Sequence, residues 1–210
     1  MPSPRVPDLG RPGGFATSPG AGYTLFETAL GSCAIVWSNS GIAGIELPEP
    51  SVAGTRRSVA ERHPGAVEAE PPPDVRKASE AIARHLAKGA ADLSWMRLDM
   101  DRLSPFARRV YEEARAVPAG ATVSYGGLAE RLGRPGAARA VGQALKRNPF
   151  AVVVPCHRVV AAGGGIGGFS AGAGTDTKRR ILEIEGAAPI PAMERLSSDA
   201  RLVRVARQVP

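Results

Sequence analysis

Cys156, His157 and Arg158 bring a thiol, an imidazole and a guanidinium to one point of the chain. A free cysteine has a pKa of about 8.5, so only a few per cent is the reactive thiolate at neutral pH without help. His157 and Arg158 are the nearest groups that could supply this help, which favours a nucleophilic cysteine. A single cysteine is nevertheless often a small buried hydrophobe, and neighbouring residues of a strand point to opposite faces. The triplet alone leaves both interpretations open.

The segment before the triplet predicts how the thiol is held. Residues 151–154 form an apolar run rich in valine, which is typical of a buried strand. Pro155 should end this strand because proline has no N–H to donate to a sheet ladder. The other cysteine, Cys33, lies among apolar residues, and we expect it to pack in the core without a chemical role.

Length and composition exclude several classes of protein. The 210 residues suffice for one large domain or two small ones. No segment approaches the length of a membrane span, and the first residues lack the apolar run of a secretory signal. Two cysteines do not make a disulfide framework, so we expect a cytoplasmic protein. The three histidines and two cysteines have no zinc-site spacing, so we expect no metal, and we expect no cofactor.

The positive charge is concentrated in one part of the chain. Residues 101–160 hold ten basic and four acidic side chains, which accounts for +6 of the net charge of +7. Nucleic acid is the natural partner of such a basic segment. A solvated basic face explains the charge equally well, so charge alone does not decide.

The first half of the chain predicts a small α/β unit over residues 21–100, after a disordered arm at 1–20 that is rich in proline and glycine. Strands are expected at 23–30, 33–37 and 42–47, with a hairpin turn at 39–41. Residues 50–73 predict a loop with at most one short helix. Asp74 should cap a helix over 74–88 that ends at Gly89, with His85 as a surface or packing residue. A short strand at 95–100 would complete the unit.

The second half predicts a mainly helical unit over residues 101–188, followed by a disordered tail at 189–210. Ser104 should cap one helix, and Ser124 a second that runs to residue 132. A turn at 133–136 and a further helix at 137–147 complete a helix-turn-helix pattern. Gly142 costs this last helix about 1 kcal/mol relative to alanine, which suggests close approach of either a packed helix or a DNA backbone. The glycine-rich residues 163–168 lack a phosphate-binding motif and favour a pocket wall or lid, before a last helix at 177–185.

Several ordered motifs then point to one family. They are Val123-Ser124-Tyr125-Gly126, the stretch from Pro135 to Gly142, Asn148-Pro149, Pro155-Cys156-His157-Arg158-Val159, Gly168-Phe169-Ser170 and Glu185-Gly186. With these motifs the chain resembles the O6-alkylguanine-DNA alkyltransferases. The resemblance implies an α/β (α+β) fold with a small ribonuclease-H-like N-terminal domain of antiparallel strands. A mainly helical, DNA-binding C-terminal domain would follow.

The resemblance also implies a reaction. An alkylated guanine, and also O4-alkylthymine, would leave the base stack and pass its alkyl group irreversibly to Cys156, once per protein molecule. Glu185 would polarise His157, which would act on the thiol through a water molecule. Tyr125 would donate a proton to the departing guanine, and Asn148 would brace the turn between helix and strand.

The resemblance further assigns the DNA contacts and the pocket. Arg139 would fill the gap left by the extruded base, and the second helix would enter the minor groove. The DNA-facing residues would be Tyr125, Ala137, Ala138, Arg139, Gly142 and Gln143. The substrate pocket would comprise Ala151, Val159, Phe169 and Ser170, with the carbonyl groups of Val159 and Cys156 reading the base's amino group. The expected partner is double-stranded DNA containing alkylated guanine, bound by a monomer.

Three other functions stay open on the sequence. A non-catalytic binder of alkylated DNA shares this architecture but lacks the cysteine. A transcription regulator could use the helix-turn-helix alone, although a helix of alanine and glycine offers few side chains to read bases. A cysteine hydrolase would use the same thiol on a small ester.

Overall fold

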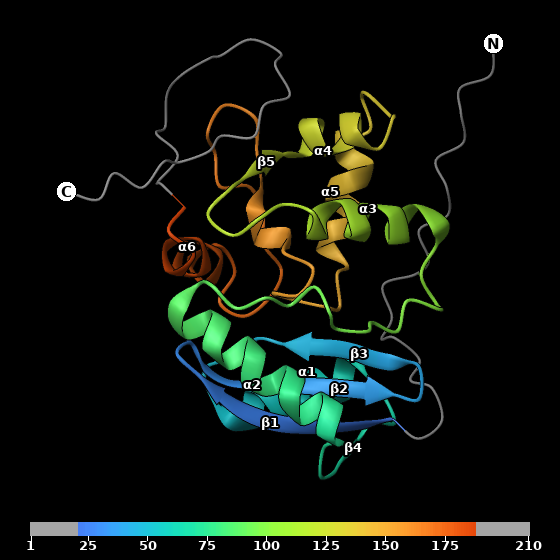
Figure 1. The fold of residues 1–210 in the computed structure, drawn as a ribbon, viewed down its shortest axis with the longest axis vertical. Helices are drawn as coiled ribbons and strands as arrows, with labels where there is room; N and C mark the ends of the chain where they lie inside the picture. Colours follow the sequence, from blue (N-terminus) through green and yellow to red (C-terminus); the bar gives the residue numbers. More distant parts are fainter. Residues whose placement is uncertain (1–20, 188–210) are drawn as a thin grey trace.

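The computed structural model describes residues 21–187, and it places a four-stranded sheet at one end and most of the later helices at the other (Figure 1). The strands are β1 (Gly22–Thr28), β2 (Gly31–Ser38), β3 (Gly41–Glu46) and β4 (Val67–Glu68). They lie in the order β3-β2-β1-β4, with β1, β2 and β3 antiparallel and β4 parallel to β1. The mixed α/β fold and the hairpin between β2 and β3 are therefore confirmed.

Helices α1 (Val52–Arg62) and α2 (Pro73–Lys88) cover opposite faces of this sheet. The reason lies in β2, whose alternate side chains point to opposite sides. Ala34 and Val36 pack with Val59 of α1, whereas Ile35 packs in the cluster that contains Ile82 of α2. Cys33 belongs to the α2 side and is fully buried, and burial raises its pKa to about 12, as expected of a packing residue.

Three predictions for this half were wrong in whole or in part. Residues 50–73, expected to be a loop with at most one short helix, do contain one helix, α1, but the strand β4 in this segment was not predicted. Asp74 does not cap α2, which begins one residue earlier at Pro73 with Pro72 as N-cap; proline suits the first turn because no partner is needed for its missing N–H. No strand forms at residues 95–100, where Leu98 makes only an isolated bridge to Ile42.

The second half folds largely as its capping residues predict. The Ser104 and Ser124 side chains accept hydrogen bonds from the third residue beyond each, at the starts of α3 and α4. The elements are α3 (Pro105–Arg115), β5 (Val123–Ser124), α4 (Tyr125–Arg131), α5 (Ala138–Lys146), the 3₁₀ helix η1 (Cys156–Arg158), β6 (Val159–Val160) and α6 (Thr175–Ile184). Strands β5 and β6 pair in parallel. Within residues 21–187 no helix combines the length and apolar character needed to cross a membrane.

The apolar run before Cys156 is buried, but it is not a strand. Residues 151–153 form a turn in which Val152 adopts a φ of 72°. Asn148 holds this turn: its Nδ2 donates to the Val154 carbonyl at 2.9 Å, and its Oδ1 accepts from the Phe150 N–H at 2.9 Å. Residues 151–153 join the sheet-side core, while Phe150 and Val154 join the helical core. Contact with two cores gives the same apolar pattern as a buried strand, which explains the wrong prediction.

The domain boundary near residue 100 stays a prediction, because residues from beyond it contribute to the sheet-side core. The arm predicted at 1–20 and the tail predicted at 189–210 lie outside the described residues.

Candidate active site

The Cys156 thiol lines a cavity of about 280 Å³ between α4, α5 and the glycine-rich loop. The predicted site residues that line this cavity are Tyr125, Gly142, Asn148, Ala151, Cys156, Phe169 and Ser170. Val159 is fully buried and is not part of the lining. The structure thus gathers side chains from five separate segments around one sulfur atom.

The resting sulfur is a thiol. Burial raises the pKa of Cys156. The Asn148 Nδ2 group, 3.4 Å from Sγ, the positive charge of Lys178 and hydrogen bonds from the main chain of Cys156 and His157 oppose this effect. Because burial outweighs these effects, the thiolate must form when a base removes the proton.

His157 is placed to be that base. Its Nε2 lies 2.9 Å from Oε1 of Glu185, and a carboxylate can only accept, so Nε2 carries a hydrogen. In the neutral ring Nδ1 is then an acceptor, and within residues 21–187 it has no hydrogen-bond partner. Burial lowers the pKa of His157; Glu185 opposes this effect, and the charges of Arg158 and His85 reinforce it. A buried neutral imidazole with one bare nitrogen is a proton acceptor next to the thiol in the chain.

Glu185 is the centre of a buried charged cluster at the end of α6. Arg158 donates to it twice, from Nε to Oε2 at 2.9 Å and from Nη2 to Oε1 at 2.7 Å. With the hydrogen bond from His157, His85 contributes a fourth, from Nε2 to Oε1 at 2.8 Å. Burial alone would raise the pKa of Glu185, but the hydrogen bonds from His157, His85 and Arg158 hold it well below its usual range.

Two predictions are corrected by this cluster. Arg158, expected to assist the thiol directly, instead binds Glu185 and the carbonyl oxygen of Val117. His85, expected to be a surface or packing residue, is buried and hydrogen-bonded to the site carboxylate. Neither contact could be read from local sequence, because Arg158 lies 27 residues and His85 lies 100 residues from Glu185.

Lys178 is a site residue that the sequence analysis missed. Its Nζ donates to the Val159 carbonyl at 2.7 Å and lies 3.4 Å from the Gly168 carbonyl. Burial lowers its pKa to about 8, and attraction to Cys156 opposes this effect. The sequence did carry a signal, because Lys178 shares the inward stripe of α6 with Ile181 and Glu185 at helical spacing. A lysine in an otherwise buried stripe requires a partner.

The side walls of the cavity come from α4 and the glycine-rich loop. Tyr125 donates from Oη to the Gly168 carbonyl at 3.4 Å, and burial raises its pKa, so the phenol keeps its proton. Ser170 donates to the Lys146 carbonyl at 2.8 Å. A Cβ placed on Gly142 would meet the Tyr125 ring at 3.7 Å, an ordinary contact. Packing within the protein therefore does not require glycine at position 142.

The outer face of helix α5 carries few large side chains. Arg139 and Gln143 are exposed on it, Ala137 and Ala138 are partly exposed, and the buried Val141 and Leu145 anchor the opposite side. Of the predicted DNA-facing residues, only Tyr125 and Gly142 also line the cavity. The cavity therefore opens beside this helix.

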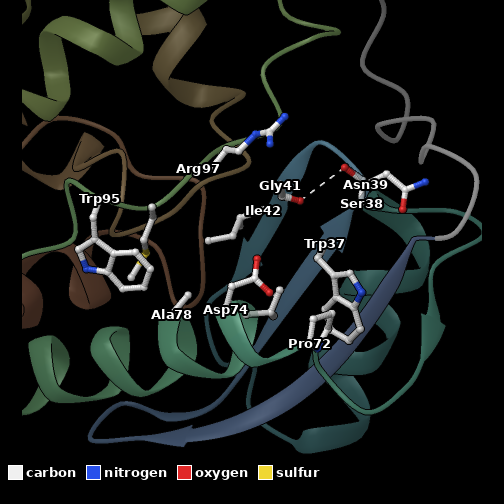
Figure 2. Close-up of a pocket in the computed structure, with 12 residues that line it drawn as sticks. Trp37, Ser38, Asn39, Gly41, Ile42, Pro72, Asp74, Ala78, Trp95 and Arg97 are labelled. Carbon is white, nitrogen blue, oxygen red and sulfur yellow. Dashed lines mark hydrogen bonds between the residues drawn. The ribbon is translucent and has the colours of Figure 1, made fainter.

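A second cavity, of about 260 Å³, lies beside the sheet and contains none of the predicted site residues. Figure 2 shows Trp37 and Trp95 on its two sides with Asp74 between them. Within residues 21–187 no group of three or more histidine, cysteine or acidic side chains is arranged to hold a metal ion.

The fold and site define a mixed α/β protein in which a partly buried cysteine thiol lines a cavity beside a buried histidine–glutamate pair. Residues 105–187 match the family model described as the DNA-binding domain of 6-O-methylguanine DNA methyltransferase. A methylated-DNA–protein-cysteine methyltransferase of Methanothermobacter thermautotrophicus is 32% identical over 152 residues, which cover 72% of this chain and 78% of that relative. The chain belongs to this family of methyltransferases.

Other relatives match over shorter stretches. The methylated-DNA–protein-cysteine methyltransferase of Mycolicibacterium paratuberculosis is 47% identical over 97 residues, 46% of this chain and 58% of that relative. The chain thus spans less than two thirds of that relative.

Two solved structures share the fold. Mycobacterium tuberculosis OGT in complex with DNA is 28% identical with a TM-score of 0.61, covering 80% of this chain and 96% of that one. O6-methylguanine-DNA methyltransferase from Pyrococcus kodakaraensis is 28% identical with a TM-score of 0.62, covering 79% and 99%.

Proposed function

We propose that this protein repairs DNA by direct reversal, transferring an alkyl group from O6 of guanine to Sγ of Cys156. The observation that supports this most is a thiol lining a cavity of about 280 Å³ with the His157–Glu185 pair next to it. Small-molecule pockets usually measure about 300–1,000 Å³, so this cavity suits a single base. A base inside a duplex hides its O6 substituent, so the nucleotide must first leave the stack.

The transfer begins with a proton. The Cys156 proton passes through a water molecule to the bare Nδ1 of His157, and Glu185 stabilises the imidazolium that results. The thiolate attacks the alkyl carbon, so the S–C bond forms while the C–O6 bond breaks and its electron pair goes to the guanine. Tyr125 donates a proton to the departing base, and the positive charge of Lys178 stabilises the thiolate. The product is a thioether, which has no good leaving group, so each molecule reacts once.

Helices α4 and α5 form the proposed helix-turn-helix, with α5 lying in the minor groove. Its bare face allows close approach to the DNA, while exposed Arg139 is long enough to occupy the gap left by the flipped base. The mycobacterial relative solved in complex with DNA supports DNA as the partner. O4-alkylthymine, which also carries its alkyl group on a ring oxygen, is the second proposed substrate. A monomer in the cytoplasm remains our prediction.

Mass spectrometry tests the proposal. The protein is incubated with excess double-stranded oligonucleotide containing one O6-methylguanine, and peptides are then mapped. We expect one methyl group to replace one hydrogen on Cys156, with no gain in a Cys156→Ala variant. An unchanged mass, or more than one methyl removed per protein molecule, contradicts the proposal.

The alternatives fit the site less well. A non-catalytic binder of alkylated DNA has no use for a thiol, a bare imidazole nitrogen and a carboxylate assembled in this way. A cysteine hydrolase would release its product and continue to turn over a small ester. Repeated turnover of p-nitrophenyl acetate that depends on Cys156 would favour that function instead.

A further inference from the structure

Two histidines share the carboxylate of Glu185, and they come from different parts of the fold. His157 lies on η1, next to the nucleophile, whereas His85 lies in the last turn of α2. Helix α2 packs along the sheet (Figure 1). Their Nε2 atoms lie 2.9 Å and 2.8 Å from the same oxygen, Oε1. All three side chains are almost completely buried. The first unit of the fold thus contributes a side chain to the charged cluster around Glu185.

The hydrogen bonds give the two rings different roles. Both nitrogens of His85 face acceptors, since Nε2 meets Glu185 and Nδ1 lies 3.2 Å from the Ala91 carbonyl. A neutral imidazole has only one N–H, so the doubly protonated ring is the form that satisfies both contacts. His157 faces an acceptor through Nε2 only, which leaves Nδ1 to take a proton. Both rings therefore donate to the carboxylate, but only His157 has a second nitrogen that can accept a proton.

The main chain fixes this contact. Gly89, which ends α2 with a φ of 71°, packs so closely on the end of α6 that an added Cβ would clash with the Ile184 carbonyl and lie 2.8 Å from Cα of Glu185. No side chain fits between the two helix ends. Backbone packing thus sets the separation of the two helix ends that carry His85 and Glu185.

The charge on His85 has a consequence for the base. The groups that face Glu185 are His85 from α2 and His157 and Arg158 from η1, and Lys178 lies about two turns earlier on the same face of α6. An uncompensated buried carboxylate would hold a proton on its histidine partner. Cations on the far side of the carboxylate reduce this pull and leave His157 neutral, ready to accept the thiol proton.

We propose that His85 is a positioning residue for alkyl transfer: from the sheet side it fixes Glu185 and, as a cation, keeps His157 in its neutral form. This rests on the proposed function, in which His157 is the base. His85 touches neither the thiol nor the base, and it acts only through the carboxylate.

The test compares His85→Gln with the wild-type protein and with His63→Gln. Glutamine keeps a hydrogen-bond donor but removes the charge. His63 is the matched control, because it is a buried histidine 3.1 Å from a buried glutamate, Glu46, away from the cavity. Single-turnover transfer from an O6-methylguanine oligonucleotide is followed from acid to alkaline pH.

Loss of the cation raises the pKa of His157, and transfer requires this ring to be neutral. The acid limb of the profile should therefore move to higher pH in His85→Gln by about one unit, so that the rate at a fixed pH on this limb falls about tenfold. The alkaline plateau should stay unchanged, and His63→Gln should match the wild type. A profile for His85→Gln that superimposes on the wild type overturns the proposal.

Ring ¹⁵N NMR provides a readout that needs neither activity nor a stable variant. In the wild-type protein we expect protonation at both nitrogens of His85, and at Nε2 alone of His157. A neutral His85 ring of either tautomer overturns the proposal. If wild-type protein transfers no methyl group but shows these ring states, the proposed function fails while the assignment of the two histidines stands.

Discussion

Replacement of Asn148 by alanine should destabilise the protein through the turn that carries Cys156. The side chain satisfies two buried main-chain groups, the Phe150 N–H and the Val154 carbonyl, each at 2.9 Å. An unsatisfied buried polar group costs about 1–3 kcal/mol, so the two together predict a loss of about 2–6 kcal/mol in the free energy of unfolding. This is a large share of the roughly 5–15 kcal/mol typical of folded proteins. Val152 makes the turn especially dependent on this support, because a branched residue at a φ of 72° is intrinsically unfavourable.

Urea unfolding followed by circular dichroism measures this loss. The midpoint should fall while the m-value stays close to that of the wild type, since the same surface becomes exposed. Asn148→Asp should lose less stability than Asn148→Ala, because a carboxylate oxygen still accepts from Phe150. It should nevertheless react slowly, since a negative charge beside Sγ raises the pKa of Cys156. Gln143→Ala, at an exposed position on α5, should stay within about 0.5 kcal/mol of the wild type. An Asn148→Ala protein that unfolds at the wild-type midpoint refutes the reasoning.

The remaining predictions concern helix packing, charge and thiol reactivity. Gly89→Ala should lower the unfolding midpoint more than Gly133→Ala. Both glycines have positive φ, 71° and 67°, but an added Cβ would clash with the end of α6 at Gly89, whereas nothing lies within 4 Å of a Cβ added at Gly133. Equal losses of stability in the two variants would contradict the close helix packing. Lys178→Gln should slow single-turnover methyl transfer about tenfold, because it removes a charge that lowers the pKa of Cys156. Affinity for unmodified DNA should stay unchanged. A variant that reacts at the wild-type rate would exclude a role of Lys178 in stabilising the thiolate. Iodoacetamide at pH 8 should label Cys156 before Cys33, whose pKa is raised to about 12 by burial; peptide mapping that finds Cys33 labelled first would contradict the assignment.

Much of the local structure followed from short-range chemistry. The serine caps at positions 104 and 124, the glycine that ends α2 and the alternating strands each depend on groups a few residues apart. In such patterns the interacting groups lie close together in the sequence, and the structure confirms these predictions. The boundaries of α2 and α6 moved by only one or two residues.

The apolar run at residues 151–154 shows where local patterns fail. Valines favour strands, and burial was correctly expected, yet Asn148 folds the run into a turn between two cores. Periodicity records that side chains are buried, and it does not record which core buries them. Only the packed molecule could decide between a strand and a turn.

By itself, the sequence determined the family motifs, the candidate nucleophile with its histidine and glutamate, and most helices and strands. Tertiary structure alone decided that Arg158 and His85 converge on Glu185, that Lys178 points to the Val159 carbonyl, and that the thiol stays protonated at rest. The physical reason is distance along the chain: pKa values and buried ion pairs depend on groups as far as 100 residues apart, which no local pattern encodes.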